Sequence, residues 1–265
     1  TGITLPITKH NYLVTRAEDV APAIMEAFAV AKAGRPGPVL IDITKDAQQS
    51  SCEVDWAAAE PHLTETCDEA MPGDGDYRDA IALINAAERP LILAGHGVMQ
   101  SGAERELLAL AERAHVPIAV TLLGLGGVPA SHPLNLGMMG MHGEAWVNHA
   151  IQEADLLIAL GMRFDDRVTG NLKNYALNAR KIHVDIDRSE LNKNVRVDVG
   201  IAKDLRAALV EWLPHVASRE RSAARRSASP GSSFAFSSSS TWKTRKSSRS
   251  ERPRSAARAA SSSPL

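Results

Sequence analysis

Two short stretches of the chain combine residue types that suit a ligand carrying phosphates. Residues 137–144 read Gly-Met-Met-Gly-Met-His-Gly-Glu, so little side chain would separate their backbone amides from a bound group. Residues 161–170 place two arginines and two aspartates directly after an apolar run. A guanidinium holds phosphate oxygens through charge-assisted, bidentate hydrogen bonds. Together the two stretches predict a site for a large ligand with phosphates.

Each candidate in these stretches has a structural alternative. Arg163 and Arg167 could grip a pyrophosphate, but a surface network with Asp165 and Asp166 would explain one such pair in isolation. His142 lies between glycines in a loop, which favours a functional contact over a place in the core. The neighbouring methionines are typical of adaptable apolar packing, here against a flat ring system.

Two further candidates lie elsewhere in the chain. The Gly95-His-Gly97 turn fits a plain strand-to-helix connection and a phosphate contact equally well. Asp185 ends a predicted strand, where nucleotide-binding folds often place a carboxylate for ribose hydroxyls. A helix N-cap supplied by Asp185 or Asp187 explains the same position equally well.

These candidates need a scaffold, and the periodicity of the chain predicts one. Helical patterns alternate with apolar runs at the pace of strand, helix, strand, which predicts an α/β fold with a doubly wound parallel sheet. Ser101 and Glu104 have capping-box spacing, which predicts a helix that begins there. The strands are expected at residues 39–43, 90–94, 117–121, 155–160, 181–187 and 195–199, and the last helix near 204–212.

The unusual residues follow the carboxyl ends of these predicted strands. Gly95, Thr121, Gly161 and Asp185 each come directly after one, or end it. In an open parallel sheet those ends line the ligand crevice. We therefore expect residues that are scattered along the chain to converge at one edge of the sheet.

Composition excludes several classes of protein. The 265 residues are 44% hydrophobic, which is enough for a core, and no apolar run approaches the roughly 20 residues of a membrane span. Cys52 and Cys67 lack disulfide or zinc spacing, so we expect reduced thiols and a cytoplasmic location. The chain starts at Thr1 without a Met, which suggests a piece of a longer protein.

The last 49 residues differ chemically from the rest. They hold 17 serines and 11 Lys and Arg against two Asp and Glu, a formal charge of +9, whereas residues 1–216 carry −10. The composition is typical of a disordered linker or an RNA-binding segment. Because the change is abrupt, a shifted reading frame or a truncated gene model is the preferred interpretation, and a nucleic-acid partner is not expected.

Five segments of the chain match the motifs of one known family: residues 8–14, 34–42, 140–143, 163–170 and 183–187. The run Phe-Asp-Asp-Arg-Val-Thr-Gly after Gly-Met-His-Gly is the most specific of these matches. Together the segments resemble the acetolactate synthase (acetohydroxyacid synthase) large catalytic subunits, which depend on thiamine diphosphate. The resemblance covers about Ile7 to Trp212.

The resemblance implies a domain organisation. Residues 1–47 correspond to the C-terminal end of a pyrimidine-binding domain, and residues 48–75 to a linker. Residues 76–215 correspond to the central FAD-binding domain of thiamine diphosphate enzymes, and residues 216–265 to no part of the family. The fold expected is thus a doubly wound central domain, a partial α/β segment before it and a disordered tail.

The resemblance also implies FAD contacts and a substrate channel. Lys45, Asp166 and Arg167 match positions near that channel. Lys203 stands where the family usually has Gly, which makes its neighbour Asp204 the least secure contact. The implied FAD contacts are Arg35, Gly95, Gly97, Thr121, Leu122, Gly140, Met141, His142, Gly161, Arg163, Asp165, Arg167, Val168, Asp185, Ile186 and Asp204.

The implied activity is the condensation of two 2-oxoacids, pyruvate with pyruvate or 2-oxobutyrate, with loss of CO2, in branched-chain amino acid biosynthesis. The family uses thiamine diphosphate, Mg2+ and FAD, forms homodimers or tetramers, and can bind a regulatory subunit. Its catalytic glutamate and magnesium ligands match nothing in this chain. The Gly73-Asp-Gly75 run lacks the preceding strand and following Asn of the family's magnesium–diphosphate motif.

The resemblance therefore predicts a chain that supplies the FAD-binding module, holds no catalytic residue and no metal ligand, and is inactive alone. Two other interpretations stay open. One is another thiamine diphosphate carboligase or decarboxylase, such as glyoxylate carboligase. The other is a non-catalytic nucleotide-binding module.

Overall fold

The computed structural model describes residues 2–56 and 76–219. The Gly73-Asp-Gly75 run, Cys67, most of the predicted linker and nearly all of the Ser/Arg-rich tail lie outside the described residues. These two stretches are the N-terminal region (residues 2–56) and the central region (residues 76–219).

The central region is built on one parallel sheet of six strands in the order β5-β4-β3-β6-β7-β8. All five strand pairs are parallel, and Leu93 in the middle pairs with Ala119 on one side and Ala159 on the other. The strands are β3 (Pro90–Ala94), β4 (Ile118–Val120), β5 (Asn135–Met138), β6 (Leu156–Leu160), β7 (Arg180–Asp185) and β8 (Val199–Ala202).

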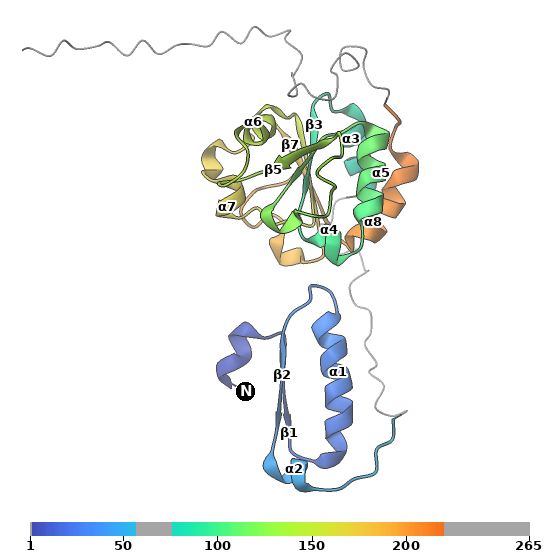
Figure 1. Ribbon diagram of the computed structural model, residues 1–265, viewed down its shortest axis with the longest axis vertical. Coiled ribbons are helices and arrows are strands. Elements are labelled where there is room, and N and C mark those ends of the chain that lie inside the picture. The colour runs from blue at the N-terminus through green and yellow to red at the C-terminus, as the bar shows by residue number, and fades with distance from the viewer. Residues whose placement is uncertain (1, 57–75, 220–265) are drawn as a thin grey trace, which may run out of the picture. The chain divides into compact units, whose positions relative to one another are not determined.

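Helices cover both faces of this sheet (Figure 1). On one face α3 (Tyr77–Ala86), α5 (Glu104–Ala114) and α8 (Leu205–Trp212) pack on a core with the fully buried Trp212 at its α8 side. On the other face α6 (Ala145–Glu153) packs on a second core with Leu157 and Phe164. Every residue of β3 and β6 is buried, as expected of parallel strands covered on both faces. The predicted doubly wound α/β fold is confirmed.

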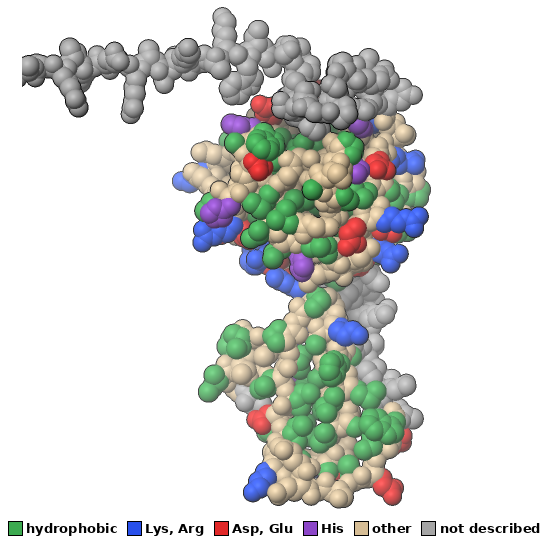
Figure 2. Space-filling model, viewed as in Figure 1, with side chains coloured by type: hydrophobic (Ala, Val, Ile, Leu, Met, Phe, Trp, Pro, Cys, Tyr) green, Lys and Arg blue, Asp and Glu red, His purple; other side chains and the backbone are tan. Residues whose placement is uncertain are grey.

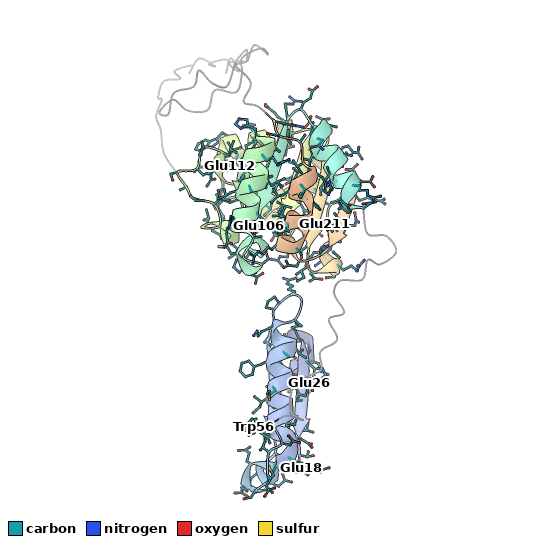
Figure 3. The ribbon with its side chains drawn as sticks, turned by 90° about the vertical axis from the view of Figure 1, so that its right-hand side faces the viewer. Glu18, Glu26, Trp56, Glu106, Glu112 and Glu211 are labelled. Atoms are coloured by element: carbon teal, nitrogen blue, oxygen red, sulfur yellow. The ribbon has the colours of Figure 1, made fainter. Side chains whose placement is uncertain are left out.

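Ion pairs join helices of the first face at its surface. Arg206 of α8 lies 3.4 Å from Glu106 of α5, and Lys203 lies 2.9 Å from Glu211 of α8. Figure 3 labels Glu106 and Glu211 on this helical layer. Partly exposed pairs of this kind add little to stability, so the buried apolar residues beneath them stabilise the layer.

The edge strand β5 was absent from the strands expected from sequence. Its Asn-Leu-Gly-Met run has no β-branched residue, and Gly137 has φ +105°, so no strand pattern is visible. Several of its main-chain groups are bonded outside the ladder with β4, by side chains or by the loop that follows. Trp146 Nε1 donates to the Leu136 carbonyl, the Gly137 N–H donates to Asn135 Oδ1, and the Glu144 N–H donates to the Met138 carbonyl.

Two local expectations are wrong. The strand expected at 195–199 lies at Val199–Ala202, and just before it Asp198 bonds Lys181 of β7 through both its N–H and its carboxylate. The capping box of Ser101 and Glu104 does not form, since α5 begins after Ala103 without a side-chain cap. The Ser101 hydroxyl instead donates to the Gly97 carbonyl and closes the short helix α4 (Gly97–Gln100).

The N-terminal region is much smaller. It consists of a 3-10 turn (Gly2–Ile7), β1 (His10–Val14), α1 (Val20–Lys32), β2 (Val39–Ile43) and α2 (Lys45–Gln49), with β1 and β2 paired in parallel. Figure 2 shows apolar side chains over much of its visible face. Ile3, Leu13 and Phe28 are all more than half exposed.

No helix among the described residues is long and apolar enough to cross a membrane.

Candidate functional site

Two loops meet where the sheet order reverses, at the carboxyl ends of β3 and β6. The Gly95 N–H donates to the Leu160 carbonyl at 3.0 Å, and the Gly97 N–H donates to the Gly161 carbonyl at 2.9 Å. A Cβ at Gly95 would lie 2.3 Å from the Gly161 oxygen, and a Cβ at Gly161 would lie 2.7 Å from the Gly97 Cα. Glycine at these positions lets two backbones touch at the point where open parallel sheets bind ligands.

Residues 137–144 and residues 161–170 lie side by side. The Met141 N–H donates to the Arg167 carbonyl at 2.8 Å. A Cβ at Gly140 would lie 2.6 Å from that same oxygen, and one at Gly143 would lie 2.4 Å from the Met138 oxygen. These glycines therefore bring backbone against backbone. The ligand contact expected of this stretch stays a prediction.

A cavity of about 700 Å³ opens beside the β3 and β6 loops. This volume lies within the range of small-molecule and cofactor sites. Twelve of the sixteen expected contacts line it: Arg35, Gly97, Thr121, Leu122, Gly161, Arg163, Asp165, Arg167, Val168, Asp185, Ile186 and Asp204.

The other four expected contacts do not line this cavity. Gly95 acts through its contact with Gly161, while Gly140, Met141 and His142 belong to the neighbouring loop. Met141 is more than half exposed, and its sulfur lies 3.6 Å from Arg167 Nη1. The cofactor role of these four stays a prediction.

The cavity also contains residues that sequence reasoning missed. All of them except Lys32 are chain neighbours of an expected contact or of another lining residue. The sequence signal was therefore present, but it could not separate lining from non-lining side chains. They are Lys32, Gly34, Pro36, His96, Gln100, Ser101, Leu123, Met162 and Leu205.

The two arginines of the second stretch keep much of their surface. The Arg163 side chain is 50% exposed and has a 3.4 Å contact with Asp165, while Arg167 is 70% exposed and lies 3.9 Å from Asp166. The Asp165 carboxylate also accepts from the Val168 N–H and caps α7 (Asp166–Thr169). The predicted Arg–Asp network is present but loose, so both guanidinium groups could turn to an anion in the cavity.

Asp185 and His183 lie on β7 beneath the cavity. Asp185 Oδ1 accepts from the Asp187 N–H at 2.9 Å, and burial raises the pKa of its carboxyl group. The His183 ring is fully buried, and burial lowers its pKa despite the Met162 carbonyl and the nearby Asp185. A neutral imidazole 3.9 Å from Asp185 does not form an ion pair with it.

The helix-cap alternative for the aspartates is settled in favour of Asp187. Its carboxylate accepts from the Ser189 N–H and caps the 3-10 turn Arg188–Glu190, leaving Asp185 free of that role. Asp187 Oδ2 also accepts from Arg35 Nη1 at 2.9 Å, and this hydrogen bond raises the pKa of Arg35.

Asp204 lines the cavity and also caps α8, accepting from the Ala207 N–H at 2.9 Å. Lys203 before it replaces the expected Gly without a positive φ, and its ammonium group pairs with Glu211 at 2.9 Å. Because the Lys203 ammonium group is paired with Glu211, it leaves the Asp204 carboxylate available at the cavity.

Two of the three residues matched to the substrate channel, Lys45 and Asp166, do not line the cavity. Lys45 begins α2, and Asp166 begins α7 with a strongly exposed carboxylate. Arg167 lines the cavity. The channel assignment of all three stays a prediction.

The donor set of the cavity fits FAD. It combines two guanidinium groups for a pyrophosphate, an acceptor carboxylate for ribose hydroxyls, and the apolar side chains of Leu122, Met162 and Val168 for a flat ring. The parts of the chain that the structure describes contain no group of three His, Cys, Asp or Glu side chains that could hold a metal ion.

Comparison with known proteins agrees with this geometry. The family model described as thiamine pyrophosphate enzyme, central domain, matches residues 77–212. The acetolactate synthase isozyme 1 large subunit of Escherichia coli is 45% identical over 220 residues, 83% of this chain and 38% of the relative. An acetolactate synthase of Mycobacterium bovis is also 45% identical, over 212 residues, 80% of this chain and 34% of the relative.

A solved structure shows the same fold. Benzoylformate decarboxylase from Polynucleobacter necessarius superposes with a TM-score of 0.64 at 23% identity, over 81% of this chain and 40% of that one. In each comparison this chain spans well under half of the relative's length.

Proposed function

The chain belongs to the thiamine pyrophosphate enzymes through their central domain, and we propose that it is the FAD-binding portion of an acetolactate synthase large subunit. The observation that carries the proposal is the cavity at the β3 and β6 loops. Twelve residues that the family resemblance assigns to FAD line it, although they come from segments far apart in the chain.

The proposed roles follow from side-chain chemistry. Arg163 and Arg167 bind the pyrophosphate by charge-assisted hydrogen bonds, and their weak contacts with aspartates leave them able to do so. Asp185 accepts from ribose hydroxyls. Leu122, whose side chain is largely exposed, covers the flavin ring together with Val168. FAD bound in this way takes no net redox part in the carboligase reaction.

The whole protein is proposed to join two molecules of pyruvate, or pyruvate and 2-oxobutyrate, with loss of CO2 on the route to branched-chain amino acids. Thiamine diphosphate, Mg2+, a second copy of the subunit and a regulatory subunit belong to that proposal, as does a cytoplasmic location. Because the family's catalytic glutamate and magnesium ligands match no residue of this chain, we assign it no step of the thiamine diphosphate chemistry.

Titration of the purified chain with FAD tests the cofactor assignment. Binding should perturb the flavin absorption spectrum, and Arg163→Ala should weaken it about tenfold or more, as expected for a lost charge-assisted hydrogen bond. Arg105→Ala is the matched control, because Arg105 is an exposed arginine of α5 that does not line the cavity. Equal affinities for the two variants would contradict the assignment.

An activity assay tests a second part of the proposal. The chain spans 38% of the Escherichia coli relative, and none of its residues is assigned to the catalytic step. The 265-residue polypeptide by itself should therefore form no acetolactate from pyruvate, thiamine diphosphate, Mg2+ and FAD. Colorimetric detection of acetolactate above a protein-free blank would refute this part.

A further inference from the structure

His183 is an unusual residue for its surroundings. Its ring is fully buried on β7, in register with Ala159 of β6, within the core that α6 covers. The Phe164 ring meets it edge-on, with 5.1 Å between the ring centroids. An aliphatic side chain would fill such a space without a polar atom to satisfy, so the imidazole needs another explanation.

One nitrogen of the ring supplies that explanation. Nε2 lies 2.8 Å from the Met162 carbonyl oxygen. A carbonyl only accepts, so Nε2 carries the proton and the neutral ring has its lone pair on Nδ1. Nδ1 is buried and has no hydrogen-bond partner among the described residues. The ring thus satisfies the Met162 carbonyl but leaves its own Nδ1 unpaired, a cost in stability that an aliphatic side chain would not carry.

The Met162 carbonyl lies inside the turn that presents the cavity's charged side chains. Gly161 before it has φ +58° and donates its N–H to the Val184 carbonyl. Arg163 after it lines the cavity, and Met162 itself is buried. With an aliphatic residue at 183 the Met162 carbonyl would lose this donor. A shift of the turn that let water donate to this carbonyl would then be favourable.

We propose that His183 is a positioning residue of the cofactor site, whose neutral Nε2–H holds the Met162 carbonyl and so fixes the turn that carries Arg163. Only the expected effect on FAD affinity rests on the proposed function. The expected effect on the turn does not depend on FAD. Strand β7 then serves the site twice, through His183 below the turn and Asp185 at the cavity.

Three variants test the proposal. His183→Leu removes the donor and keeps an apolar side chain, whereas His183→Gln keeps an N–H near the position of Nε2. Lys181→Met is the matched control, because Lys181 is also buried on β7 but its ammonium group donates to the Ala176 and Ala179 carbonyls, outside the 161–165 turn. Denaturant unfolding first establishes conditions in which every variant is folded.

Amide hydrogen exchange of the protein without flavin is the first measurement. In His183→Leu, peptides that cover residues 161–169 should exchange about fivefold faster or more, while peptides from α5 and α8 stay unchanged. His183→Gln should largely restore the slow rate, and Lys181→Met should leave these peptides unaffected. Unchanged exchange in His183→Leu, or acceleration spread evenly over the central region, would overturn the proposal.

FAD titration is the second measurement. His183→Leu should raise the Kd about tenfold, with His183→Gln close to the unsubstituted chain. If the unsubstituted chain binds no FAD, the proposed function fails while hydrogen exchange still decides the role of His183. If it binds FAD and His183→Leu binds equally well, the positioning role fails while the proposed function stands.

Discussion

Residues 2–56 and residues 76–219 use the same elements, parallel strands with helices, but they bury very different amounts of apolar surface. The central region has six strands, helices on both faces and two cores of buried side chains. The N-terminal region has two strands, and its buried hydrophobic residues are Val14, Ala23, Ala27 and Ala47. Trp56, which Figure 3 labels, is 67% exposed.

The difference shows what parallel sheets require. A parallel sheet is stable when helices cover both of its faces, and a small unit buries too little surface to offset the loss of conformational entropy. The central region meets this requirement with its own residues. The N-terminal region leaves Ile3, Leu13 and Phe28 exposed, so its sheet needs apolar partners beyond residues 2–56 to match the burial of the central region.

The largest predicted effect comes from separating the two regions. A polypeptide of residues 76–219 should fold by itself, whereas residues 1–56 alone should not, because they bury almost no large side chain. Far-UV circular dichroism with thermal melting checks both, with a cooperative transition expected only for the first. A cooperative transition for residues 1–56 would remove the contrast.

A smaller effect is expected when one large side chain of each region is truncated in the full 265-residue polypeptide. Trp212→Ala should lower the free energy of unfolding by about 3–5 kcal/mol, because Trp212 is fully buried in the central core. Phe28→Ala should change it by about 0.5 kcal/mol or less, since Phe28 is 69% exposed. Urea denaturation measures both, and a loss for Phe28→Ala as large as that for Trp212→Ala would contradict the contrast.

Glycine substitutions sharpen the contrast at the cavity itself. Gly161→Ala should destabilise the central region by about 3 kcal/mol, from left-handed strain and the collision of its Cβ with Gly97. Gly102→Ala has a similar φ of +62° but open space around its Cβ, so about 1 kcal/mol is expected. If the two losses, measured by urea denaturation, were equal, strain and not the backbone contact would explain Gly161.

The smallest predicted effect concerns pH. Burial lowers the pKa of His183 in the folded chain, so the unfolded chain binds the proton more readily and stability declines as pH falls below about 6.5. Asp185, whose pKa is raised, opposes this trend at lower pH, and Glu190 also faces the ring. Between pH 7.5 and 5.5 the unsubstituted chain should lose about 1 kcal/mol more than His183→Gln. Parallel loss in both would assign the trend to other groups.

Much of the central fold followed from local pattern, since apolar runs without alternation predicted the buried strands β3 and β6 within one residue. The ends of those runs also indicated which residues would meet at the cavity. Strand β5 could not be found in this way, because it forms through pairing with β4 and through bonds from Trp146 and Glu144.

Other features depend on contacts between distant parts of the chain. Ser101 matched a capping box, but whether its hydroxyl closes α4 or caps α5 depends on where the backbone turns after Gly97. His183 was part of a matched motif, yet nothing in its neighbours indicates that its ring reaches Met162, 21 positions earlier in the chain. The sequence pattern predicts the strand, but tertiary packing determines which groups its side chains bond.

The closed edge of β5 has a consequence for association between molecules. An open edge strand is a template on which another chain can add a strand, the first step toward domain swapping and fibril growth. In β5 the Leu136 carbonyl is taken by the Trp146 indole, and the Gly137 N–H by Asn135. Replacing Trp146 by Phe would reopen one acceptor on this edge, and the central region should then aggregate faster at high concentration while its fold is kept.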